Sequence, residues 1–174
     1  MSWRVSFYKA DKNEPLTREL VHEDDDGTVY EETYINGEEI LNNEGTVIWL
    51  EEISKEDKEN LELFEQLWED PSGDCDYYEV KRPGLKLFIE KYQKHIIKMY
   101  EDMIADPDNP LDGPEGYAKR KLWNWQHNLV INLRDNYKFA GVTFSDFWEY
   151  TIFNLVYLYH NFDFENYKLV LYGG

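Results

Sequence analysis

The chain has 174 residues and a formal net charge of −18, with 42% hydrophobic and 17% aromatic residues. This length suits one domain or one domain with an appended lobe, and the aromatic content excludes disorder caused by low hydrophobicity. Cys75 is the single cysteine, which excludes an internal disulfide and favours a reducing compartment. We therefore expect a single cytoplasmic domain over residues 1–174, with an acidic, strand-rich part at 1–53 and a mostly helical part at 54–174.

The excess negative charge is confined to the first 80 residues. Residues 1–80 contain 24 Asp and Glu against 6 Lys and Arg, whereas residues 81–174 contain 12 of each kind. Charge is informative about partners and encounter rates rather than about fold, and this distribution favours a negative face directed at a basic partner. The same charge disfavours direct binding to nucleic acid or anionic lipid. No stretch has the pattern of a signal peptide or of a membrane span.

The first 50 residues show the alternation of strands. Candidate strands, with apolar and polar residues alternating or with strand-forming residues between turns, lie at residues 3–9, 17–22, 28–35 and 46–50. Asn36 and Gly37, between residues 33–35 and 38–40, predict a two-residue type I′ hairpin, because both central positions of that turn need positive φ. These segments together predict an antiparallel β-meander.

Helical periodicity begins at Ser54, a candidate N-cap. Residues 54–69 place Leu61, Phe64 and Trp68 on one side of an expected helix. Three further helices, a short strand and a closing strand are expected at residues 83–105, 114–139, 144–162, 77–81 and 167–172. The fold class is therefore predicted as α+β: an N-terminal antiparallel β-meander packed on a C-terminal bundle of about four helices, with a C-terminal strand.

Glutamates make up the expected partner-binding surface. Those of the 54–69 helix repeat at i, i+3 and i+4, a spacing of about 5–6 Å that resembles a ladder of phosphates. Like charges at this spacing destabilise a helix, so we interpret the face as one that serves binding; the alternative is a solvated surface that maintains solubility. The expected surface comprises Glu31, Glu32, Glu38, Glu39, Glu51, Glu52, Glu59, Glu62, Glu65 and Glu69.

Two acidic segments have partial matches to catalytic or metal motifs. Residues 106–115 hold enough acids for a calcium loop, but Pro110 stands at the fifth position and Gly113 at the eighth, so the EF-hand spacing fails. Glu79 and Lys81 match the Glu-x-Lys of metal-dependent nucleases. Their neighbouring acids lie too close in sequence, however, and the net charge opposes a polyanionic substrate. Neither segment predicts an active site.

The remaining candidates are single residues. The four histidines lie far apart without paired-ligand spacing, which disfavours a zinc site completed by Cys75; they are His22, His95, His127 and His160. We expect no metal, no cofactor and no catalytic residue. Trp123 and Trp125 lie about 200° apart on a helix, so one of them is expected to be exposed as a candidate anchor for a partner.

Three function hypotheses follow. The first is a non-enzymatic acidic protein that binds and blocks a basic, nucleic-acid-binding protein, as DNA-mimic antirestriction and anti-CRISPR inhibitors do. The second is an immunity protein that neutralises a cognate basic toxin, and the third is a small enzyme or ligand binder with a cleft between sheet and helices. The first two predict association that slows with salt. A duplex-like array of acids favours the first, and acids around an aromatic hot spot favour the second.

Overall fold

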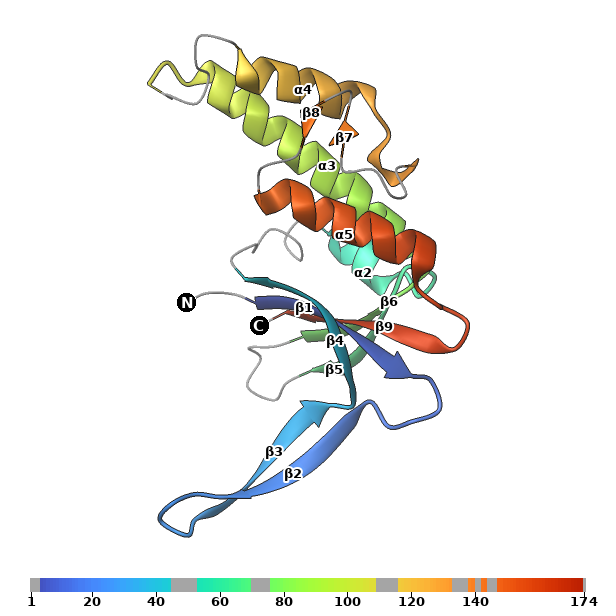
Figure 1. Ribbon diagram of the computed structural model, residues 1–174. Helices are drawn as coiled ribbons and strands as arrows, with labels where there is room; N and C mark the ends of the chain where they lie inside the picture. Colours follow the sequence, from blue (N-terminus) through green and yellow to red (C-terminus); the bar gives the residue numbers. More distant parts are fainter. Residues whose placement is uncertain are drawn as a thin grey trace. The chain divides into compact units, whose positions relative to one another are not determined.

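The computed structural model describes residues 4–44, 53–69, 76–108, 116–132, 138–139, 142–143 and 147–173. They belong to two compact units that interleave in the sequence (Figure 1). The first unit comprises Met1–Val47, Lys55–Lys81 and Asp163–Gly174, and the second comprises Ile48–Ser54 and Arg82–Phe162. The predicted α+β class is confirmed, with antiparallel strands in the N-terminal half, about four helices and a C-terminal strand.

Five antiparallel strands form the main sheet of the first unit, in the order β4-β1-β9-β6-β5. They are β1 (Arg4–Asp11), β4 (Gly37–Glu44), β5 (Phe64–Glu69), β6 (Asp76–Val80) and β9 (Tyr167–Gly173). The C-terminal strand β9 lies in the middle of this sheet, between β1 and β6. The connectivity therefore differs from the expected meander, because β1 pairs with β4 and β9 instead of with the next strand in the chain.

The register of the main sheet determines which residues share a face. Phe7, Leu171 and Tyr78 lie directly opposite one another across β1, β9 and β6, and all three are buried. Residues directly opposite share a face, and successive residues alternate between faces. Phe64, Val80 and Leu169 lie on the same face as these three. The other face is mixed: it carries the buried Val170 and Ser6 together with Tyr8, Tyr77, Tyr172, Glu65 and Glu79.

A separate two-stranded sheet consists of β2 (Thr17–Glu23) and β3 (Val29–Ile35). We call residues 17–35 the acidic ribbon. It leaves the main sheet between β1 and β4 and projects away from it (Figure 1). The hairpin expected at Asn36 and Gly37 is wrong, because β3 pairs with β2 while β4 pairs with β1.

The helix expected over residues 54–69 is also wrong in most of its length. The helix α2 covers only Lys55–Glu59, and the strand β5 follows at Phe64. A turn follows at Asn60, whose side-chain Oδ1 accepts a hydrogen bond from the N–H of Glu62 at 3.0 Å and whose carbonyl oxygen accepts from the N–H groups of Leu63 and Phe64, each at 2.9 Å. Pairing of β5 with β6 across the sheet thus overrides the local preference for helix.

The second unit is mostly helical. It contains α3 (Arg82–Ala105), α4 (Tyr117–His127), the short 3-10 helix η2 (Val130–Asn132) and α5 (Phe147–Asn161), and the two-residue strands β7 (Lys138–Phe139) and β8 (Val142–Thr143) pair with each other. The helix expected over 114–139 is therefore too long. The strand expected at 46–50 lies outside the described residues.

The buried residues of α3 follow helical periodicity, whereas Leu129, just after α4, is 70% exposed. Leu85, Phe88, Tyr92 and Ile96 of α3 are buried, as the spacing predicts. The side chain of Gln93, also on α3, donates hydrogen bonds to the carbonyl oxygens of Trp125 and Asn128 at 2.7 and 2.8 Å. These bonds satisfy carbonyl groups that the end of α4 leaves without a helical partner. None of the described helices is both long and apolar enough to cross a membrane.

Candidate protein-binding surface

The acidic ribbon is held in one continuous antiparallel register, with Thr17 opposite Ile35 and Glu23 opposite Val29. At its base the N–H of Asn36 donates to the carbonyl oxygen of Leu16 at 2.6 Å. The ribbon is therefore ordered from its base outward, although only two strands form it.

The tip of the ribbon is closed by Asp24. Its N–H donates to the carbonyl oxygen of Thr28 at 3.0 Å, and its carboxylate accepts from the N–H groups of Asp26 and Thr28 at 3.0 and 2.8 Å. Gly27 adopts a φ of 78° in this turn, a conformation that glycine takes readily. The Asp24 carboxylate holds the turn, and Asp24, Asp25 and Asp26 are all exposed at the tip.

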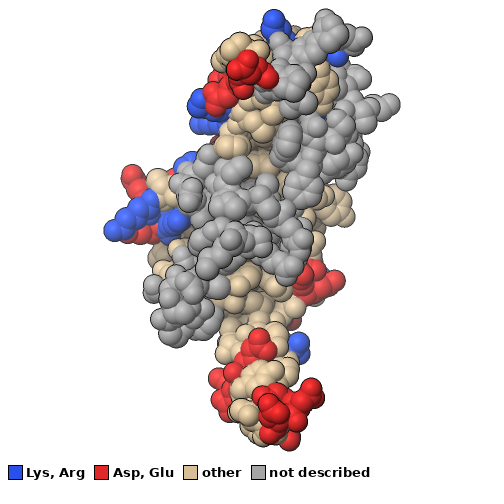
Figure 2. Space-filling view, turned by 90° about the vertical axis from the view of Figure 1, so that its left-hand side faces the viewer, with Lys and Arg blue, Asp and Glu red and all other residues tan. Residues whose placement is uncertain are grey.

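Carboxylates dominate the surface of the ribbon. Residues 17–35 contain seven Asp and Glu but only one Arg, and all seven acids are exposed. Figure 2 shows Asp and Glu side chains gathered in its lower part, where the ribbon lies. The acids are Glu19, Glu23, Asp24, Asp25, Asp26, Glu31 and Glu32. Only Glu31 and Glu32 were among the expected site residues, and the density of acids in residues 19–26 was the signal for the others.

Exposed apolar side chains lie among these acids. Val21 is 66% exposed, Val29 61%, Tyr30 48% and Leu20 38%. A two-stranded ribbon is a single layer and cannot bury such residues by itself, and an isolated hairpin is only marginally stable in water. Apolar and aromatic residues framed by charged ones are the usual anatomy of a protein-binding surface.

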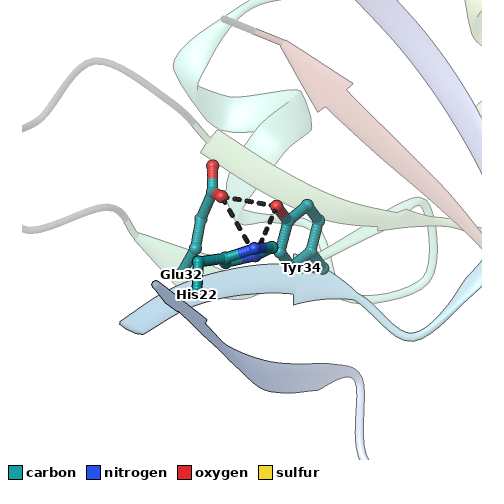
Figure 3. Close-up of polar contacts among 3 residues, drawn as sticks. All are labelled: His22, Glu32 and Tyr34. Atoms are coloured by element: carbon teal, nitrogen blue, oxygen red, sulfur yellow. Dashed lines mark hydrogen bonds and ion pairs between the residues drawn. The ribbon is translucent and has the colours of Figure 1, made fainter. Parts of the chain in front are cut away.

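One face of the ribbon carries a small polar cluster (Figure 3). The hydroxyl of Tyr34 donates to the carboxylate of Glu32, and Nε2 of His22 lies 3.2 Å from that hydroxyl and 3.6 Å from Glu32 Oε2. The ring of His22 stacks on Tyr30 with 5.3 Å between centroids. The hydrogen bond to Glu32, followed by desolvation, raises the pKa of Tyr34. The cluster thus orders this face and directs Glu32 toward its own strand.

Glu38 and Glu39, both expected in the site, lie on β4 and are exposed. They occupy opposite faces of the main sheet: Glu38 lies opposite Lys9, while Glu39 accepts a hydrogen bond from the hydroxyl of Ser6 at 2.6 Å. Glu38 also lines a cavity of about 450 Å³ at the base of the ribbon, together with Lys9, Asp11, Glu14, Arg18, Asn36, Gly37 and Tyr167.

This cavity does not resemble a small-molecule site. Its lining mixes two cations with three carboxylates, and the Lys9 ammonium already lies 4.1 Å from the centre of the Tyr167 ring. Ligand pockets are lined mainly by apolar side chains with a few placed polar groups, and here the proportion is reversed. We interpret the cavity as part of the polar base from which the ribbon projects.

The other expected acids do not form the predicted ladder. Glu59 ends α2, Glu62 lies in the following turn, and Glu65 lies on β5, where its carboxylate is 3.3 Å from Lys81 Nζ. Glu69 also belongs to β5, and Glu51 and Glu52 lie outside the described residues. The helical spacing on which the phosphate-like array depended is therefore absent.

The remaining sequence candidates are also separated. Among the described residues no three His, Cys, Asp or Glu side chains come together as metal ligands. His22 is on the ribbon, whereas His160 on α5 places Nε2 2.6 Å from the carbonyl oxygen of Ile131. His95 lies on α3 beside Tyr92, with 6.3 Å between ring centroids.

The two segments with partial motif matches do not form a site among the described residues either. Glu79 lies on β6 opposite Glu65, and Lys81 extends to Glu65. Cys75 and most of the 106–115 loop lie outside the described residues.

The expected division between the two tryptophans of α4 is confirmed. Trp125 is fully buried, whereas Trp123 is 56% exposed and stacks on His127 with 4.5 Å between ring centroids.

Comparison with protein-family models, with curated proteins and with solved structures gave no match.

Proposed function

We propose that this chain is a non-enzymatic acidic protein that binds a basic, nucleic-acid-binding protein through the acidic ribbon and blocks it. The observation that carries the proposal is the exposure of Val21 and Val29 within a projecting ribbon of seven carboxylates. Acids supply the long-range attraction to a cationic surface, and apolar side chains supply the short-range burial that makes a complex last.

A second candidate, an immunity-type protein that neutralises a basic toxin, is favoured by a specific observation. Tyr30 is exposed next to Glu31 and shares its face of the ribbon with Leu20 and Glu32, whereas the helical ladder that supported a duplex-like array is absent. Acids around an aromatic hot spot were the arrangement expected for this candidate. Both candidates use the same surface and differ in the protein that it captures.

Affinity capture with matched charge reversals tests the proposal. The ribbon variant carries Glu19→Lys, Glu23→Lys and Glu31→Lys, and the control variant carries Glu56→Lys, Glu101→Lys and Glu165→Lys, all at exposed positions. Both variants change the net charge equally. We expect basic proteins from a lysate of the source organism to be retained by the wild type and the control, and to be lost from the ribbon variant.

Equal retention by all three proteins would contradict the proposal, as would equal loss from both variants, because either result removes the special role of the ribbon. Duplex DNA added to the captured complex then separates the two candidates. Release of the captured protein by DNA supports a blocked nucleic-acid-binding groove, and resistance to DNA supports neutralisation at another surface.

A further inference from the structure

We infer that the ribbon binds its partner by pairing the outer edge of β2 with an extended, basic segment of that partner. This inference rests on the proposed function and deepens it, because it names the mode of binding and the chemistry of the bound segment. Addition of a strand to a free sheet edge is an established mode of protein recognition, in which backbone hydrogen bonds hold the added strand and side chains select it.

The register determines which backbone groups point outward. Leu16 with Asn36, at the base, and Asp24 with Thr28, at the tip, are both hydrogen-bonded pairs. Hydrogen-bonded and non-hydrogen-bonded pairs alternate along an antiparallel ribbon, and these two lie eight residues apart. The intervening odd-numbered residues therefore direct their N–H and C=O groups away from the partner strand. On β2 they are Thr17, Glu19, Val21 and Glu23.

The outer edge of β2 is open in the part of the chain that the structure describes. The sheet of β2 and β3 has only these two strands there, and Glu19, Val21 and Glu23 are all exposed. An open edge normally pairs with any extended chain that it meets, including a second copy of itself. The side chains on this edge decide which chain is accepted.

The charges on the edge select a basic strand over a second copy. If two copies paired antiparallel about Val21, Glu19 of one would lie opposite Glu23 of the other, and like charges directly opposite destabilise a sheet. A segment that alternates Lys or Arg with apolar residues would instead place cations on the face of Glu19, Val21 and Glu23, opposite both glutamates, and apolar residues on the other face, opposite Leu20. The aliphatic stem of the middle cation would cover Val21. The occupant is therefore an extended segment of alternating basic and apolar residues.

Val21→Pro tests the edge without changing charge. The N–H of Val21 points outward, so proline removes no bond within the ribbon, and edge positions of this kind tolerate proline. Its ring obstructs the incoming strand and removes one donor. Thr33→Pro is the matched control, since Thr33 occupies an outward position on β3, at the opposite edge. Amide exchange at Leu20 and His22 checks that the ribbon stays paired in both variants.

The probes are two capped peptides of equal charge, Lys-Val-Lys-Val-Lys-Val-Lys and Lys-Pro-Lys-Pro-Lys-Pro-Lys. Binding to the full chain is measured by NMR titration at low ionic strength. We expect the valine peptide to bind the wild type and Thr33→Pro alike, and to bind Val21→Pro roughly tenfold more weakly or worse. The proline peptide cannot form a strand, and the same loss is expected for it on the wild type.

Equal binding of both peptides, no binding of the valine peptide, or equal affinities of the two proline variants would overturn edge pairing. If the triple charge reversal of the ribbon still abolished capture in that case, the proposed function would stand and only its mode would be wrong. If capture survived the triple charge reversal of the ribbon, while Val21→Pro but not Thr33→Pro weakened binding of the valine peptide, edge pairing would stand and the proposed function would fail.

Discussion

Replacement of Gly37 distinguishes the structure from the turn that the sequence suggests. In a type I′ turn glycine is needed for positive φ, and asparagine is the next best residue there. In the structure Gly37 is not among the described glycines with positive φ, which are Gly27 and Gly116. It is needed instead because β4 passes close to the backbone of β1, where no Cβ fits.

The size of the effect follows from the contacts of an added Cβ. It would lie 2.8 Å from the carbonyl oxygen of Lys9 and 3.4 Å from the Cα of Ala10, and both neighbours are backbone atoms that cannot rotate away. Ordinary contact with the oxygen would require β4 to shift by roughly 0.6 Å. Overpacking of this kind costs about 1–3 kcal/mol, which for a chain of this size lowers Tm by roughly 2–4 °C per kcal/mol.

The assay compares Gly37→Ala with Gly37→Asn by urea unfolding, followed by far-UV circular dichroism, and by amide exchange of β1 and β4. Close approach predicts that both variants lose stability and that asparagine, the larger residue, is at least as harmful as alanine. A left-handed turn predicts the opposite order. An asparagine variant more stable than the alanine variant, with exchange in β1 unchanged, would refute the reasoning.

Two further predictions concern the second unit. Trp125→Ala should cost about 3–5 kcal/mol because the side chain is fully buried, whereas Trp123→Ala should stay within about 0.5 kcal/mol, as urea unfolding will show. Burial raises the pKa of the Tyr92 phenol, so the folded state keeps a proton that the unfolded state releases near pH 10. The contribution of Tyr92 to the free energy of unfolding is complete below about pH 10, and above it the free energy of unfolding falls by up to about 1.4 kcal/mol per pH unit. The loss of stability between about pH 8 and pH 11 should therefore be smaller in Tyr92→Phe than in the wild type by about that amount, and an equal loss in both would contradict the assignment.

Local patterns predicted the elements whose stability is local. The buried side of α3 and the separation of Trp123 from Trp125 follow from helical spacing, because a helix fixes which residues share a face. The alternation of residues 3–9 likewise predicted β1, and the strand expected at residues 167–172 is β9. In these segments the predicted secondary structure agrees with the observed one.

The errors arose where distant pairing decides the conformation. Leu61, Phe64 and Trp68 fit a helical face, but Phe64 lies in a strand opposite Val80, and Leu61 is 67% exposed. Asn60 was the local signal for a break, since asparagine favours turns over helix interiors. Asn36 and Gly37 misled for the same reason: nothing nearby in sequence indicates that β4 pairs with β1, about thirty residues earlier.

Of the candidate site, composition predicted the sign of the charge and the region that bears it, but not the surface. Which acids share a face depends on the pairing of β2 with β3, and a register shift of one residue would exchange the two faces. Glu31 and Glu32, neighbours on β3, lie on opposite faces of the ribbon in the observed register. The helical ladder was lost together with the helix.

Solubility alone would explain the carboxylates of the ribbon, but not the residues between them. Val21 and Val29 are more than half exposed, so they bury little surface in the isolated chain, and polar residues would serve solubility better at both positions. A ribbon selected only to repel other chains would carry charge without them. A binding surface needs both kinds of residue, because charge brings a basic partner to the ribbon while valine and tyrosine hold it there once water is excluded.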